Sequence, residues 1–543
     1  MNGAQLLLKC LEAEGVEYIF GIPGEENLHI MDALLDSPIR FVTCRHEQGA
    51  AFMADVYGRL TGRAGVCLAT LGPGATNLIT GVADADMDNA PLVAIAGQAS
   101  TTRLHKESHQ VLDLEQMFQP ISKYSCRILS PATIPEMVRK AFKLAQTEKP
   151  GASFIEFPEN IAKLEVDEFP LDVRTPIPAE PSAGRLASAA EVIANAKWPI
   201  ILAGNGAVRA GASAELAALA ETLNIPVAHT FMAKGVIPFS HPLCLGSVGL
   251  QASDHVSCGF SRADVIICVG YDLVEYHPHL WHPGRDRVII HIDQTPSEVD
   301  RHYGVGVCVV GDIKSSLRAL RLQIPPRSGN LLRPLRDALV ADMEQHADDT
   351  GFPVKPQKLI HDLRAALRDD DIVICDVGAH KMWMARMFPC ERPNTCIISN
   401  GFASMGIAVP GAVAAKLTHP EQRVVAVTGD GGFLMNSQEV ETAMRLGLAL
   451  VILIWTDASY GLIEWKQMNG FGRPSQVHFN NPDFVRYAES FGAKGYRIER
   501  GEDLLPTLRQ ALIDDTVVII DCPVDYRENL RLTQQLGEMV CPV

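Results

Sequence analysis

The sequence predicts an α/β protein of three domains, each built on a doubly wound parallel sheet. Short, nearly continuous apolar runs alternate with helical patterns along almost the whole chain. Runs of this length are typical of strands buried on both faces, and their alternation with helices is typical of parallel sheets. At 543 residues the chain is also long enough for about three domains of ordinary size.

Two proline-rich stretches divide the predicted strands into groups. Residues 166–184 are rich in Pro and charge, and residues 323–334 are rich in Pro, Gly and Arg. Such compositions are typical of linkers, so we expect domains over residues 1–165, 185–325 and 350–543. The clearest strand predictions are residues 66–70, 92–96, 200–203, 265–269, 288–292, 372–375, 424–427, 449–455 and 517–520.

Charge and hydropathy exclude several kinds of partner. The net charge is −16, from 48 basic and 64 acidic residues, which argues against a nucleic-acid partner. The longest strongly apolar run, residues 448–455, is too short to cross a bilayer, and the N-terminus lacks the features of a signal peptide. The 13 cysteines include no C-x-x-C pair, which indicates reduced thiols rather than a disulfide framework. We therefore expect a cytoplasmic protein with no membrane partner.

A glycine-rich turn, Gly-Asp-Gly-Gly at residues 429–432, joins a buried strand to a helical pattern. Such a turn offers free N–H groups and a helix N-terminus at the edge of the sheet where ligands collect, which suits phosphate. The carboxylate of Asp430 would repel phosphate unless a cation lies between them, and Mg²⁺ shares oxygen ligands with phosphates in this way. For Asp430 taken alone, a tight turn with a solvated side chain is the simpler interpretation.

A second carboxylate, Asp457, follows the next predicted strand. One strand-helix-strand unit separates it from Asp430, so we expect both at adjacent strand ends, with the backbone carbonyl of Ser459 nearby. Taken alone, Asp457 is also explained as a helix cap or turn residue. As a set, Asp430, Asp457 and Ser459 predict an oxygen-ligand site for Mg²⁺.

The GDG turn and Asp457 together resemble the magnesium and thiamine diphosphate motif of the thiamine-dependent enzymes. The resemblance to this family covers essentially the whole chain. Most of the family has Asn at the second position, whereas Asp occurs in the catabolic, flavin-independent acetolactate synthases, which the chain resembles in other places too. The segments CDVGAHKMW (375–383) and SNGFASMG (399–406) resemble those that cover the diphosphate and thiazolium. Thiamine diphosphate and Mg²⁺ are the cofactors that this resemblance implies. The cofactor-binding residues that it implies are Gly378, His380, Met405, Gly429, Asp430, Gly431, Gly432, Asp457, Tyr460, Gly461 and Leu462.

The resemblance also supplies two catalytic candidates in the first segment. Residues 40–62, RFVTCRHEQGAAFMADVYGRLTG, resemble the family's glutamate motif, in which Glu47 would bond N1′ of the aminopyrimidine and promote loss of the C2 proton. A Glu in a first helical turn otherwise serves to compensate the helix dipole. Residues 108–125, SHQVLDLEQMFQPISKYS, resemble the stretch in which acetolactate synthases place a substrate-facing Gln, here Gln110.

The middle segment favours the flavin-independent enzymes. VGYDLVEYHPHLWH (269–282) resembles a segment of the catabolic acetolactate synthases, and no segment resembles the flavin contacts of the biosynthetic enzymes, so FAD is not expected. GNGAVRAG (204–211) has two glycines of a dinucleotide fingerprint, but Arg209 occupies the third position. We interpret His277, His279 and His282 as loop histidines rather than metal ligands.

Decarboxylating carboligation is the reaction that the resemblance implies: CO₂ leaves one 2-oxo acid, and the remaining unit joins a second. With pyruvate, the product is 2-acetolactate. The family builds its site across a subunit interface, which implies a homodimer or homotetramer.

One departure concerns the segment after GIPG, where the catabolic enzymes usually have Lys and this chain has Glu25 and Glu26. This charge reversal would weaken the binding of an anionic substrate unless another cation compensates. Three alternatives therefore stay open: a simple 2-oxo acid decarboxylase, a carboligase with another donor or acceptor, and a non-catalytic cofactor-binding relative.

Overall fold

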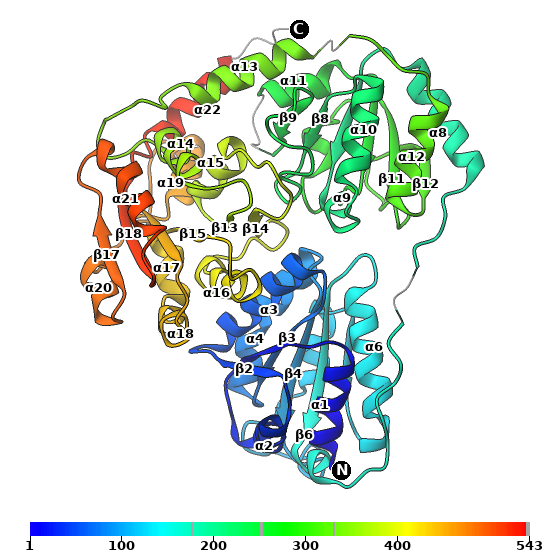
Figure 1. Cartoon of the computed structure of the whole chain (residues 1–543), viewed down its shortest axis with the longest axis vertical. Helices are drawn as coiled ribbons and strands as arrows, with labels where there is room; N and C mark the ends of the chain where they lie inside the picture. Colours follow the sequence, from blue (N-terminus) through cyan, green and yellow to red (C-terminus); the bar gives the residue numbers. More distant parts are fainter. Residues whose placement is uncertain (175–176, 250–253, 330–331, 539–543) are drawn as a thin grey trace.

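The computed structural model describes residues 1–174, 177–249, 254–329 and 332–538. It contains three six-stranded parallel sheets with interleaved helices, which confirms the predicted α/β fold. In Figure 1 the first domain lies at the bottom, the central domain at upper right and the third domain at upper left. The inner strands are largely apolar because residues on their two faces enter different hydrophobic cores: Cys67 and Val66, adjacent in one strand, lie on opposite sides of the first sheet.

The first sheet has the strand order β2-β1-β3-β4-β6-β5, and every neighbouring pair is parallel. Its strands are β1 (Tyr18–Gly21), β2 (Arg40–Thr43), β3 (Gly65–Ala69), β4 (Leu92–Gln98), β5 (Tyr124–Arg127) and β6 (Ala152–Pro158). Its helices are α1 (Gly3–Ala13), α2 (Leu28–Ala33), α3 (Glu47–Thr61), α4 (Pro73–Met87), α5 (Leu114–Phe118), α6 (Ile134–Gln146) and α7 (Glu159–Lys163).

The central sheet has the order β12-β11-β10-β7-β8-β9. Its strands are β7 (Pro199–Ala203), β8 (Val227–His229), β9 (Cys244–Ser247), β10 (Val265–Val269), β11 (Val288–Asp293) and β12 (Val305–Val310). Its helices are α8 (Ala183–Asn195), α9 (Asn205–Arg209), α10 (Ser213–Leu223), α11 (His255–Arg262), α12 (Ile313–Gln323) and α13 (Arg333–Glu344). Helix α13 packs against α11 and β9, so this domain reaches beyond the stretch that the sequence indicates as a linker.

The third sheet has the order β14-β13-β15-β16-β18-β17. Its strands are β13 (Ile372–Cys375), β14 (Cys396–Ile398), β15 (Val424–Gly429), β16 (Val451–Thr456), β17 (Lys494–Arg497) and β18 (Val518–Pro523). Its helices are α14 (Pro356–Ala366), α15 (Ala379–Met387), α16 (Ala408–Thr418), α17 (Asp430–Asn436), α18 (Glu439–Arg445), α19 (Gly461–Phe471), α20 (Phe484–Ser490), α21 (Leu504–Ala511) and α22 (Glu528–Glu538).

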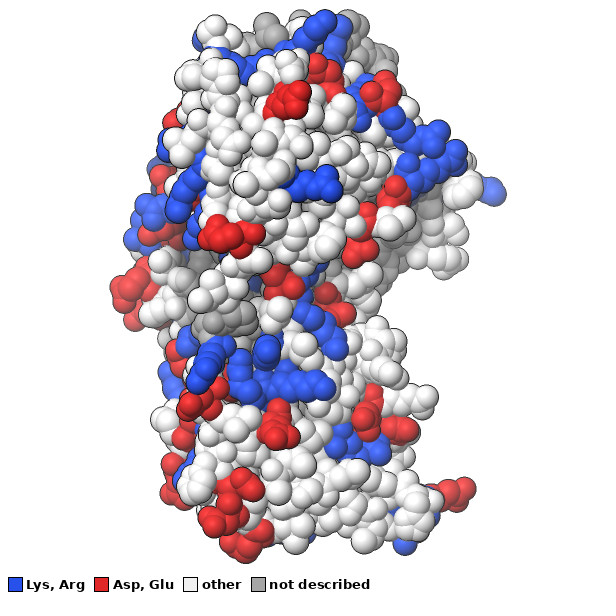
Figure 2. Space-filling view, turned by 90° about the vertical axis from the view of Figure 1, so that its right-hand side faces the viewer, with Lys and Arg blue, Asp and Glu red and all other residues white. Residues whose placement is uncertain are grey.

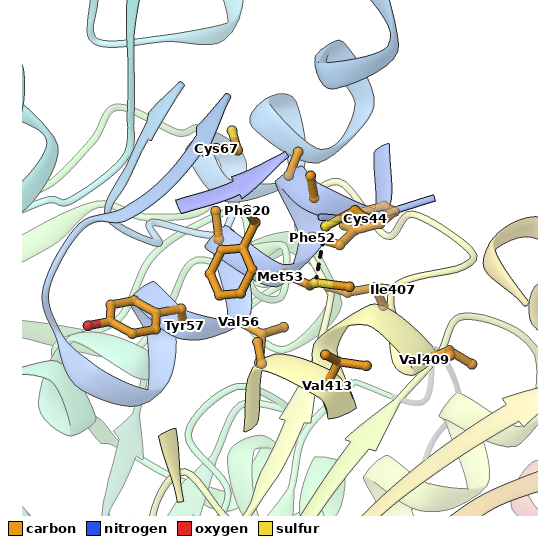
Figure 3. Close-up of a cluster of buried hydrophobic side chains, with 14 of the residues drawn as sticks. Phe20, Cys44, Phe52, Met53, Val56, Tyr57, Cys67, Ile407, Val409 and Val413 are labelled. Carbon is orange, nitrogen blue, oxygen red and sulfur yellow. Dashed lines mark hydrogen bonds between the residues drawn. The ribbon is translucent and has the colours of Figure 1, made fainter. Parts of the chain in front are cut away.

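One hydrophobic core joins the first and third domains. Helix α3 packs along α16, and side chains from both sheets enter the same cluster. Figure 3 shows Met53 and Val56 of α3 on the side of this helix that faces Ile407 and Val413. The position of α3, and hence of the residues at its start, is therefore fixed by the third domain as well as by its own sheet.

Ion pairs join the first and central domains. The ammonium of Lys149 lies 2.6 Å from the carboxylate of Asp272, and Arg209 pairs with both Glu148 and Asp272. Arg209, which interrupts the dinucleotide fingerprint, thus occupies the carboxyl edge of the central sheet. Figure 2 shows both charge signs side by side at the narrow waist of one face, without a broad basic surface.

Most of the cysteines are free thiols, as expected from the sequence. Eleven of the 13 are free, and all but Cys308 of these are buried. Cys258 differs from the prediction because it is disulfide-bonded. No helix in the described part of the chain combines the length and hydrophobicity that a membrane span requires.

Candidate active site

The candidate site is a cavity of about 170 Å³ at the carboxyl edge of the third sheet. Strand β14 lies on one side of β13 and β15 on the other, so the winding of the sheet changes direction between β13 and β15. In open parallel sheets, ligands bind at such a crevice. Turns that follow β13, β15 and β16 supply most of the cavity wall.

All residues that the sequence indicates for cofactor or metal line this one cavity. They are Gly378, His380, Met405, Gly429, Asp430, Gly431, Gly432, Asp457, Ser459, Tyr460, Gly461 and Leu462. Six lining residues were not predicted: Val377, Ala379, Ala403, Trp455, Ile463 and Tyr526.

Asp430 opens helix α17 and is only 1% exposed. Its Oδ2 accepts hydrogen bonds from the backbone N–H of Ala458 at 2.7 Å and of Asp457 at 3.1 Å. The side-chain amide of Asn481 donates to the same oxygen at 2.7 Å, and the N–H of Gly431 donates to Oδ1 at 2.9 Å. These four donors fix the carboxylate and tie the turn after β15 to the loop after β16.

The neighbouring carboxylate of Asp457 lies in an environment that disfavours its charge. Burial, followed by the charge of Asp430, raises the pKa of Asp457 to about 8. No Lys or Arg is found among the lining residues of this cavity, all of which are described. Two close carboxylates without a cationic side chain are a donor set that suits a divalent cation.

The metal site would need oxygens beyond these carboxylates. Among the described residues, no group of three or more His, Cys, Asp and Glu is arranged to hold a metal ion. The backbone carbonyl of Ser459 and phosphate oxygens would have to complete an octahedral set. The Ser459 loop is well held, because Ser459 bridges to His478 and its hydroxyl donates to Glu464 at 2.6 Å.

Two unpaired nitrogen atoms also line the cavity. The Nε2 of His380 and the Nε1 of Trp455 are buried without a hydrogen-bond partner. Burial lowers the pKa of His380 to about 3, so its imidazole is neutral near pH 7. Buried polar groups are rarely left unsatisfied, and these two suit a ligand that carries acceptor oxygens or nitrogens.

Two glycines allow close approaches in the cavity wall. A Cβ on Gly461 would lie 2.7 Å from Oδ2 of Asp457, and one on Gly432 would lie 3.1 Å from Cγ of Asp376. Asp376 accepts the N–H of Gly406 at 2.8 Å, which fixes the loop that presents Met405. Asp376 was not predicted, because its role depends on this contact between two loops.

Glu47 lies at the carboxyl edge of the first sheet. It is the first residue of α3, follows the N-cap His46, and is 9% exposed. The side-chain amide of Asn77 donates to its Oε2 at 2.9 Å, and a Cβ on Gly74 would lie 3.3 Å from Oε1. The sequence did not indicate Asn77, which is on the neighbouring helix α4.

Gln110 lies over the glycine turn of the first sheet. A Cβ on Gly72 would lie 2.9 Å from Cβ of Gln110, which is exposed and has a φ of 59°. Neither Glu47 nor Gln110 is among the residues that line the cavity of the third domain. Within one chain, the predicted catalytic residues and the predicted cofactor residues are thus on two separate sheet edges.

Three sequence models of one family match the chain in order. They are the N-terminal binding domain, the central domain and the C-terminal binding domain of thiamine pyrophosphate enzymes, over residues 1–117, 186–320 and 376–522. The fold and the cavity thus define a thiamine-diphosphate-dependent enzyme.

Similar proteins indicate which kind of thiamine-diphosphate-dependent enzyme this chain is. The acetolactate synthase of Bacillus subtilis (strain 168) is 36% identical over 99% of this chain and 97% of its own length. The catabolic acetolactate synthase of Raoultella terrigena is 37% identical over 98% of this chain and 97% of its own length. The probable acetolactate synthase large subunit of Methanocaldococcus jannaschii is 36% identical over 99% of this chain and 94% of its own length. The chain therefore belongs to the thiamine pyrophosphate enzyme family and is an enzyme of the acetolactate synthase type.

Proposed function

We propose that this enzyme joins two pyruvate molecules to form 2-acetolactate and CO₂. The observation that carries the proposal is the cavity in which Asp430, Asp457, His380 and Met405 converge, taken together with the acetolactate synthases among its relatives. Two pyruvate anions and one proton give one acetolactate anion and one CO₂. The bond to the donor carboxylate breaks, and the donor's carbonyl carbon, which is a ketone carbon in the product, bonds to the acceptor's carbonyl carbon. The proton ends on the acceptor's oxygen, which becomes the new hydroxyl group.

The side chains of Asp430 and Asp457 and the carbonyl of Ser459 would hold Mg²⁺, which in turn would bind the diphosphate. The neutral imidazole of His380 would hydrogen-bond the cofactor through its unpaired Nε2, and the apolar side chain of Met405 would support the thiazolium ring. When bound, thiamine diphosphate supplies the electron sink for CO₂ loss. The apolar part of the wall excludes water and favours the charge-dispersed state that forms as CO₂ leaves.

Glu47 is proposed to act on the cofactor held by a second copy of the chain. Its carboxylate, oriented by Asn77, would hydrogen-bond N1′ of the aminopyrimidine and promote removal of the C2 proton. Since Glu47 is not part of the cavity of its own chain, the proposal requires a homodimer, alone or within a tetramer, with Gln110 facing the substrate.

A test of the function begins with purified protein, thiamine diphosphate, Mg²⁺ and pyruvate, with products followed by NMR. We expect one CO₂ for every two pyruvates, with acetolactate formed, and no requirement for added FAD. Acetaldehyde as the sole product would instead identify a simple decarboxylase. A lack of CO₂ release despite bound cofactor would overturn pyruvate as the donor. The many free thiols are in keeping with reaction in the cytoplasm.

A further inference from the structure

Tyr526 lines the cavity of the third domain, although the sequence gave no reason to place it there. It lies just after β18, which pairs with β16, the strand that ends in front of Asp457. On its other side, β16 pairs with β15, whose turn carries Asp430. Since β16 is in the middle, Tyr526 and Asp430 come from the strand ends on either side of Asp457.

The backbone next to Tyr526 is held without help from its side chain. The N–H of Val524 donates to the carbonyl of Thr456 at 3.1 Å, which ties the segment to the end of β16. The N–H of Asp525 donates to the carbonyl of Val354 at 2.9 Å. Because these bonds fix the segment, a change confined to the end of the Tyr526 side chain should leave the fold intact.

The ring of Tyr526 packs beside the carboxylate of Asp457. It stacks on the ring of Trp455, with centroids 6.3 Å apart and an angle of 27° between the planes. A Cβ on Gly461 would lie 3.6 Å from Cδ2 of Tyr526 and 2.7 Å from Oδ2 of Asp457. The phenol and the carboxylate thus border the same glycine of the cavity wall.

The hydroxyl of Tyr526 is a neutral donor in an acidic environment. Burial, followed by the charges of Asp457 and Asp430, raises the pKa of Tyr526, so the phenol keeps its proton. Within the described part of the chain, no residue forms a hydrogen bond with this hydroxyl. A polar group in such a place is usually hydrogen-bonded, which indicates an acceptor from outside the chain.

The other hydroxyl groups of the cavity differ from that of Tyr526. Ser459 and Tyr460 also line the wall. The hydroxyl of Ser459 already donates to Glu464 at 2.6 Å, and Tyr460 is 40% exposed. Tyr526 is less exposed than Tyr460, and its hydroxyl has the two carboxylates as neighbours. It is therefore the hydroxyl best placed for a ligand that binds Mg²⁺ at those carboxylates.

We propose that the hydroxyl of Tyr526 donates a hydrogen bond to the diphosphate of the cofactor, next to Mg²⁺. Since the cavity wall, which is described completely, carries neither Lys nor Arg, phosphate oxygens away from Mg²⁺ depend on neutral donors. A hydrogen bond to a charged acceptor is stronger than one between neutral groups. The inference rests on the proposed positions of Mg²⁺ and the diphosphate, and it does not depend on pyruvate being the substrate.

The first test compares the wild type with Tyr526→Phe, which removes the hydroxyl and keeps the ring. In calorimetric titration with thiamine diphosphate at fixed Mg²⁺, the affinity of the variant should be about 10-fold lower. Tyr496→Phe is the matched control, because Tyr496 lies in β17 of the same domain and its hydroxyl donates to Asp514 at 3.1 Å. Its affinity should stay within about 2-fold of wild type, and melting temperatures show whether both variants are folded.

Phosphorus NMR of the bound cofactor tests where the hydroxyl binds. At saturating cofactor, a phosphorus resonance of the diphosphate should shift in Tyr526→Phe and stay unchanged in Tyr496→Phe. The loss of a donor changes the charge on a phosphate oxygen, whereas the ring that shapes the wall is the same in Tyr526→Phe and the wild type.

Equal affinity in Tyr526→Phe and the wild type would overturn the inference. A lower affinity without any phosphorus shift would do the same, because the hydroxyl would then act on another part of the cofactor. Unchanged affinity with weaker self-association in sedimentation would instead place the hydroxyl at a contact with a second copy of the chain. Failure of the proposed function looks different, since the wild type itself would then bind no cofactor or release no CO₂ from pyruvate.

Discussion

The first and third domains share one strand order and differ in what they place at the same edge. The order β2-β1-β3-β4-β6-β5 of the first sheet corresponds strand by strand to β14-β13-β15-β16-β18-β17 of the third. In both, a glycine-rich turn follows the third strand of the domain, beginning at Gly72 in one and at Gly429 in the other. The third domain places a carboxylate in that turn, and the first places one at the start of the helix after its second strand.

We therefore propose that the two domains, which share one strand order, have different chemical roles. In the third domain, Asp430 is held by four donors beside Asp457, an arrangement that suits a cation and a phosphate. In the first domain, the amide of Asn77 donates to Oε2 of Glu47, and no described residue donates a hydrogen bond to its Oε1. The sheet supplies the crevice, and the neighbours of each carboxylate decide whether it binds a metal or shares a proton.

Replacing Glu47 with Gln should have the largest effect and should affect catalysis alone. We expect turnover and C2–H exchange of the cofactor to fall by about 1,000-fold, because the variant cannot share a proton with N1′. Cofactor affinity, measured by calorimetry, should change by less than about 3-fold.

Glu136→Gln is the matched control for this variant. Glu136 is an exposed Glu in the first turn of another helix, α6. If Glu47 served only to compensate the helix dipole, both variants would behave alike, with losses of about 1 kcal/mol or less in stability and unchanged exchange.

Asp430→Ala should produce the opposite pattern, a loss of binding rather than of chemistry. We expect the affinity for thiamine diphosphate in the presence of Mg²⁺ to fall by about 100-fold, because the remaining ligands hold Mg²⁺ more weakly and Mg²⁺ is what offsets the charge of the diphosphate. Calorimetric titration measures this, with Asp515→Ala, an exposed Asp of the same domain, as control. An affinity equal to that of wild type would show that Asp430 does not hold the metal, and the proposed difference between the two domains would then be wrong.

The strands and the glycine-rich turn of the third domain could be predicted from the sequence, whereas the contacts between its loops could not. Buried strands and the GDG turn are local signals, so the position of Asp430 at a strand end followed from pattern alone. Asn481, which donates to Asp430, and Tyr526, which lines the cavity, could not be found in this way, because both come from loops far along the chain. Asn77 was not predicted for the same reason, because its hydrogen bond to Glu47 depends on the packing of α3 against α4.

The smallest predicted effect concerns Glu439, which connects the two domains. Its Oε1 accepts the N–H groups of Arg45 at 3.0 Å and of His46 at 3.1 Å, just before Glu47, and Thr442 donates to its Oε2. Burial raises the pKa of Glu439, which is fully buried at the junction. A carboxylate of the third domain thus caps the helix that carries the catalytic candidate of the first.

Glu439→Ala should lower the free energy of unfolding by about 2 kcal/mol, because two backbone N–H groups lose their acceptor in a buried place. Denaturant titration measures this, and Glu441→Ala, which breaks a surface pair with Arg445, should cost less than about 1 kcal/mol. If Glu439 also positions Glu47, C2–H exchange should fall several-fold in the folded variant at saturating cofactor. Equal stability losses in the two variants, with exchange unchanged, would mean that each domain orients its own carboxylate without help from the other.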